Sequence, residues 1–83
     1  MTREDIRKKV VGIVMAQLYL TEEPGDSDDL RENLGADSLD AVEIIMEIED
    51  ELSIYLPDEQ AQECTTLKKI VDLVETILLA KSS

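Results

Sequence analysis

Apolar residues recur at intervals of three and four in three separate stretches of this chain, and this spacing constrains the fold more than any other feature. Residues 3–18, 38–52 and 67–79 each place aliphatic side chains on one stripe of a helix. The stripes consist of Ile6, Val10, Ile13, Val14 and Leu18; of Ala41, Ile44, Ile45, Ile48 and Leu52; and of Leu67, Ile70, Val71, Val74, Ile77 and Leu78. The sequence therefore predicts three amphipathic helices around a shared core.

Composition favours an all-α fold with an aliphatic core. The chain has 83 residues, enough for a single domain over 1–83 with one modest core. Phe and Trp are absent, and Tyr19 and Tyr55 are the only aromatic residues. Three Gly and two Pro supply too little turn chemistry for an all-β fold. We expect a small four-helix bundle of three longer helices and one short helix.

The segments between the helices carry boundary signals. Residues 19–37 are acidic and contain Pro24-Gly25, which predicts a long loop between the first two helices. We expect Leu30 and Leu34 to pin this loop to the core as an ordered wrap, with the two helices antiparallel.

Polar residues mark the helix ends. Thr2 followed by Asp5 predicts an N-cap for the first helix. Asp58, after Pro57, is expected to cap a short helix of about 58–63. We expect Thr65 or Thr66 to cap the last helix, and residues 80–83 to fray.

The net charge of −12 bears on the class of partner. A chain with only eight Lys and Arg cannot present a dominant basic stripe, so nucleic acids and anionic membranes are excluded as partners. The acidity is compatible both with docking to basic patches of other proteins and with solubility alone. The chain has neither a signal-peptide pattern nor an apolar run of about 18 residues, so we expect a cytoplasmic protein without membrane insertion.

Catalytic and metal chemistry find little support in the sequence. There is no histidine, the usual general base for a Ser or Cys nucleophile and the commonest metal ligand. Cys64 is expected to be a small core residue. Residues 26–37 resemble an EF-hand loop but have Arg31 where Gly is required and Asp37 where Glu is expected. We therefore expect a non-catalytic chain without a defined metal site; loose binding of divalent ions by clustered carboxylates stays open.

Ser38 stands where the loop gives way to the second helix, and its role has two interpretations. It could be the N-cap of that helix. If Asp37 is the cap instead, Ser38 occupies the first helical position with its hydroxyl free. A phosphate ester there would lie at the positive end of the helix dipole. The helix also has more apolar surface than one core needs, since Leu39, Val42 and Met46 repeat on a second face.

The residues around Ser38 resemble a known family. The sequence "GADSLD" at 35–40, the acidic amphipathic helix that follows and "LPDE" at 56–59 closely resemble the acyl carrier proteins of fatty acid and polyketide synthesis. The similarity covers essentially the whole chain. It implies that Ser38, flanked by Asp37 and Leu39, receives 4'-phosphopantetheine from coenzyme A through a phosphopantetheinyl transferase.

The resemblance also implies a docking surface on the second helix. Its apolar contacts would be Leu39, Val42 and Met46, and its acidic rim would be Asp40, Glu43, Glu47, Glu49 and Asp50. The expected partners are acyl-loading, ketosynthase, reductase or acyltransferase enzymes with basic docking patches, and the expected state is a monomer.

Departures from the family leave the pathway open. Leu30 and Leu52 stand where the family often has Phe, and residues 53–55 are more apolar than in housekeeping fatty acid carriers. The first alternative is a peptidyl or D-alanyl carrier that loads an amino acid on the same arm. The second is an unmodified acidic helical adaptor or divalent-ion buffer.

Overall fold

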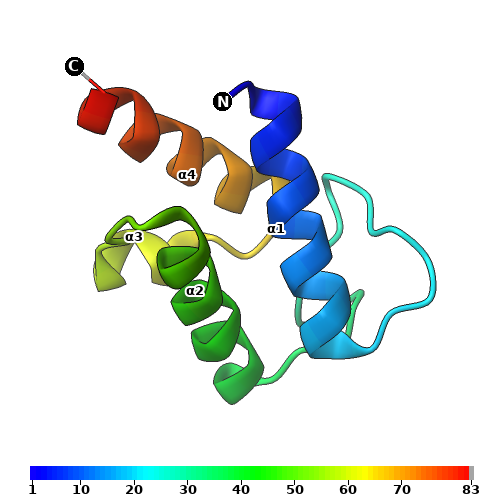
Figure 1. The fold of residues 1–83 in the computed structure, drawn as a ribbon. Helices are drawn as coiled ribbons and strands as arrows, with labels where there is room; N and C mark the ends of the chain where they lie inside the picture. The colour runs from blue at the N-terminus through cyan, green and yellow to red at the C-terminus, as the bar shows by residue number, and fades with distance from the viewer. Residues whose placement is uncertain (83) are drawn as a thin grey trace.

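Four helices make up the regular structure of residues 1–82, the part of the chain that the computed structural model describes (Figure 1). They are α1 (Arg3–Leu18), α2 (Ser38–Leu52), α3 (Asp58–Glu63) and α4 (Leu67–Ser82). Within these residues the only strand-like pairing is a single antiparallel bridge between Asp29 and Thr66. The predicted all-α bundle of three longer helices and one short helix is confirmed.

Helix α1 lies at the centre of the packing. It contacts both α2 and α4, while the short α3 packs against α4 (Figure 1). Lys9, early in α1, pairs with Glu51, late in α2, at 3.5 Å. Gln17, late in α1, donates to Asp40, early in α2, at 3.2 Å. The two helices are therefore antiparallel, as expected.

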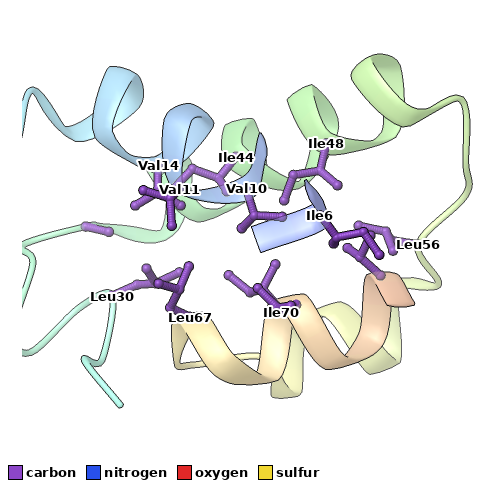
Figure 2. Close-up of a cluster of buried hydrophobic side chains, with 13 residues drawn as sticks. Ile6, Val10, Val11, Val14, Leu30, Ile44, Ile48, Leu56, Leu67 and Ile70 are labelled. Atoms are coloured by element: carbon purple, nitrogen blue, oxygen red, sulfur yellow. The ribbon is translucent and has the colours of Figure 1, made fainter. Parts of the chain in front are cut away.

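The core is built only from aliphatic side chains, which converge from α1, α2, α4 and the connecting segments (Figure 2). No polar or charged residue is buried among the described residues, and both tyrosines are exposed. The buried residues of this core are Ile6, Val10, Val11, Val14, Leu30, Ala36, Ile44, Ile48, Leu56, Leu67, Ile70, Val71 and Val74. Val11 is buried although it lies outside the predicted stripe. The reason is that α1 packs against two helices, α2 and α4, and therefore buries a wider face than one stripe.

The segment between α1 and α2 is tied to the first turn of α4. The amide of Leu30 donates to the carbonyl of Thr65 at 2.9 Å, and the amide of Lys68 donates to the carbonyl of Asp26 at 2.9 Å. The latter amide lies in the first turn of α4, where no intrahelical partner exists. Leu30 is buried and Leu34 is half-buried, so the expected pinning of this segment is confirmed.

Side chains add further ties to the same segment. Arg7 of α1 donates to Glu23 at 2.5 Å and to Asp26 at 2.8 Å, and these bonds raise the pKa of its guanidinium. The carboxylate of Asp29 accepts the backbone amides of Glu32 at 3.0 Å and Arg31 at 2.9 Å, which lower the pKa of Asp29. The backbone around residues 29–33 is therefore held in a defined turn.

The start of α2 is fixed by a capping box. The carboxylate of Asp37 accepts the amide of Asp40 at 2.8 Å, and the carboxylate of Asp40 accepts the amide of Asp37 at 3.3 Å. The same reciprocal arrangement joins Thr2 and Asp5 at the start of α1, as predicted. Because Asp37 is the N-cap, Ser38 is the first residue of α2 and is not needed as its cap.

Two predicted helix ends are corrected. Asp58 does not cap α3: Pro57 occupies the N-cap position without a side-chain bond, and Asp58 is the first helical residue. Residues 80–82 do not fray, because α4 continues to Ser82 and Lys81 donates to the carbonyl of Ser53. Ser83 lies outside the described residues. The hydroxyl of Thr66 caps α4, because it accepts a hydrogen bond from the amide of Lys69 at 3.3 Å. Thr66 is one of the two residues predicted for this cap, the other being Thr65.

The capping box predicts opposite outcomes for two neighbouring substitutions. Asp37→Ala removes the acceptor for the amide of Asp40 and should lower the free energy of unfolding by about 1 kcal/mol. Ser38→Ala removes a hydroxyl that caps nothing and should change it by less than about 0.5 kcal/mol. Urea denaturation followed by circular dichroism measures both. A larger loss for Ser38→Ala than for Asp37→Ala would show that the hydroxyl, and not the carboxylate, caps α2.

Candidate functional site

Ser38 presents an unused hydroxyl at the first turn of α2. The residue is exposed, and its side chain makes no hydrogen bond to any residue from 1 to 82. Gly35 precedes it with a φ of 77°, a left-handed conformation that glycine adopts without steric cost. The chain thus turns sharply, enters the capping box at Asp37 and delivers Ser38 to the surface.

A groove of about 830 Å³ opens beside Ser38. Its walls come from residues 29–32 of the long connecting segment, from one face of α2, from α3 and from residues 64–65 before α4. The apolar part of its lining is Leu30, Ala41, Val42, Ile45, Met46 and Ala61. A chain attached at Ser38 would therefore find an apolar surface directly next to its point of attachment.

Several residues of this groove were not identified from the sequence. Arg31, Gln62 and Cys64 line it, although each comes from a different segment. Of these three residues, only Arg31 has a distinctive sequence feature that could have singled it out. It is the only Lys or Arg between Lys9 and Lys68.

Cys64 is half-buried and packs against the core, partly as predicted, but it also lines the groove. Its Sγ donates to the carbonyl of Gln60 at 3.3 Å and lies 3.5 Å from that of Lys69. Burial raises the pKa of the Cys64 thiol, so it stays protonated at neutral pH and is a poor nucleophile. The thiol contributes to the wall of the groove rather than to covalent chemistry.

The second apolar face of α2 is open to solvent. Leu39, Val42 and Met46 are 64%, 54% and 56% exposed, while Ile44 and Ile48 on the opposite side are fully buried. Large exposed apolar side chains that gather on one helix face are typical of an interaction surface. This face adjoins Ser38, since Leu39 is its immediate neighbour in the helix.

The acidic residues expected around this face differ in their environment. Asp40 and Glu43 accept hydrogen bonds from Gln17 of α1, the former at 3.2 Å. The carboxylate of Glu49 accepts the amide of Leu56 at 2.9 Å. Glu47 and Asp50 are exposed. All five acidic residues therefore belong to α2. The carboxylates of Asp40, Glu43 and Glu49 are oriented by hydrogen bonds to other residues of the protein.

Residues 1–82 contain neither a metal-binding cluster nor a membrane-spanning helix. No group of three or more Cys, Asp and Glu side chains is arranged to hold a metal ion. None of the four helices combines the length and apolar character needed to cross a membrane.

Comparison with known proteins identifies the family. Residues 8–74 match the family model described as "Phosphopantetheine attachment site". The chain is 35% identical over 75 residues to an acyl carrier protein of Chlorobium phaeobacteroides and 36% identical over 75 residues to one of Chlorobium luteolum. Each alignment covers 89% of this chain and 96% of the relative. With the exposed serine, the adjoining groove and the four-helix fold, these matches show that the chain belongs to the acyl carrier protein family, whose members bear phosphopantetheine.

Proposed function

We propose that this chain is a discrete acyl carrier protein whose 4'-phosphopantetheine is attached to the hydroxyl of Ser38 through a phosphodiester. One observation carries the assignment: Asp37 caps α2, which leaves the Ser38 hydroxyl exposed and without a hydrogen-bond partner among residues 1–82. The first turn of a helix is also favourable for a phosphate group, because its free amides and the helix dipole are positive.

The residues around Ser38 fit the prosthetic group. When bound, the arm supplies a terminal thiol that holds an acyl chain as a thioester. The groove beside Ser38 offers an apolar lining from Leu30, Ile45 and Ala61, suited to an unbranched aliphatic chain. The apolar lining favours an acyl chain over an amino acid as cargo.

The exposed apolar face of α2, whose Val42 and Met46 also line the groove, is proposed to dock the partner enzymes. Leu39, Val42 and Met46 would supply apolar contacts, while the acidic residues of α2 would meet Lys and Arg of a phosphopantetheinyl transferase and of acyl-handling enzymes. Charge complementarity accelerates encounter without requiring a large buried area. Such an interface suits a carrier, because the carrier must leave each enzyme after its turn.

We propose that one carrier domain spans residues 1–83 and acts as a monomer in the cytoplasm. Fatty acid, polyketide and specialised lipid synthesis all use this chemistry, and the attachment and docking features proposed here are common to the three.

The attachment site is tested by the mass of the intact chain after incubation with coenzyme A and a broad-specificity phosphopantetheinyl transferase. Wild type should gain one phosphopantetheine increment, and Ser38→Ala should gain none. Ser27→Ala, which removes another exposed serine from the preceding segment, should be modified like wild type. Modification of Ser38→Ala, or none of folded wild type, would refute the attachment at Ser38.

The docking face is tested by charge reversal. Replacing both Glu43 and Glu47 with Lys should slow phosphopantetheine transfer by about tenfold at low ionic strength, and less at high salt. The matched control replaces Glu59 and Glu63 of α3, which are also exposed and four residues apart, with Lys. If both pairs slow transfer equally, net charge rather than a surface on α2 governs the encounter.

A further inference from the structure

Arg31 is an isolated positive charge in an acidic part of the chain. The chain has 20 Asp and Glu but only eight Lys and Arg, and no other cationic side chain occurs between Lys9 and Lys68. Arg31 therefore lies in the middle of the most acidic region, where partners for an ion pair are abundant.

The guanidinium of Arg31 nevertheless has no such partner. Within residues 1–82 it forms neither an ion pair nor a side-chain hydrogen bond, whereas Arg3, Arg7, Lys9 and Lys68 each pair with at least one carboxylate. Its backbone, by contrast, is held: the amide of Arg31 donates to Asp29 at 2.9 Å, within the turn that is anchored to α4. The positive charge of Arg31 helps to lower the pKa of Asp29, but no carboxylate of residues 1–82 contacts its guanidinium. A guanidinium without a direct partner, on a fixed backbone position, is available to an external anion.

Arg31 lines the same groove as Ser38 and is its only cationic residue among the lining groups. The other charged residues of the lining are Asp29, Glu32, Glu49 and Asp58. An anion that enters this groove is repelled by the carboxylates unless a cation compensates. Arg31 is the one group there that can do so, and its planar fork suits both phosphate and carboxylate oxygens.

We propose that Arg31 binds an anionic group carried on Ser38 and thereby holds the attached chain against the groove. The anion is either the phosphodiester of the arm or a carboxylate at the end of the cargo. The inference rests on the proposed attachment at Ser38. It makes Arg31 a positioning and cargo-selecting residue of the carrier.

The test compares wild type, Arg31→Gln and Lys8→Gln, each carrying the arm as confirmed by intact mass. Lys8 is a suitable control because it is exposed and lines a different groove, between α1 and α2, that does not include Ser38. Each protein is prepared with a free thiol, with a medium-length saturated acyl thioester, and with a thioester of equal length that ends in a carboxylate. The readouts are the phosphorus NMR shift of the phosphodiester and the rate of thioester cleavage by hydroxylamine at low ionic strength.

Two results support the proposal and distinguish its two forms. If the phosphodiester is the anion, Arg31→Gln moves the phosphorus resonance and speeds cleavage of both thioesters by about two- to fivefold, as expected for one exposed charge pair. If the cargo carboxylate is the anion, the phosphorus resonance stays and only the carboxylate-ended thioester is cleaved faster. In either case Arg31→Lys should recover part of the effect, and Lys8→Gln should behave as wild type.

Two other results would overturn the proposal that Arg31 binds an anion carried on Ser38. Equal phosphorus shifts and cleavage rates in wild type and Arg31→Gln would show that Arg31 contacts no anion in the groove. Equal effects of Arg31→Gln and Lys8→Gln would show only a change in net charge. Failure of the attachment at Ser38 is a separate outcome, because it appears as a missing mass increment on the wild type before any of these comparisons is made.

Discussion

The hydrogen bond from the amide of Asp40 to the carboxylate of Asp37, 2.8 Å long, sets the geometry on which the rest of the site depends. It places the N-cap of α2 at Asp37, and the helical period then determines where each later side chain points. Ile44 and Ile48 enter the core, Val42 and Met46 face solvent, and Ser38 is exposed at the first helical position. Had Ser38 been the cap, its hydroxyl would be engaged in holding the helix.

The groove beside Ser38 depends on a second constraint, the attachment of the long connecting segment to α4. Leu30 is buried and its amide donates to Thr65, while Arg7 ties the same segment to α1 through Glu23 and Asp26. These ties keep residues 29–32 in place as one wall of the groove. Another wall is α3, a helix of six residues with no buried side chain. The groove thus has one firmly anchored wall and one lightly packed wall, which suits a surface that receives and releases a chain.

Much of the fold follows from the sequence because helix periodicity and capping are local properties. The three long helices, the caps at Thr2 and Thr66 and the exposed second face of α2 could all be predicted from residues a few positions apart. One misjudged feature is local, since the N-cap position of α3 is Pro57 and not Asp58. The others depend on contacts between distant residues. The last turn of α4 is supported by a bond from Lys81 to Ser53, and the groove joins Arg31 to Cys64, which no local pattern connects. Residues near Ser38 in sequence were therefore found, whereas those near it only in space were not.

The central claim is that the hydroxyl left free by the Asp37 cap is the one that carries the arm. Tandem mass spectrometry of proteolytic peptides from the transferase-treated chain tests this at the level of the single residue. The account predicts that every fragment ion containing Ser38 bears the phosphopantetheine increment and that fragments with Ser27, Ser53 or the threonines bear none. An increment located on any of those other hydroxyls, with Ser38 unmodified, would contradict it.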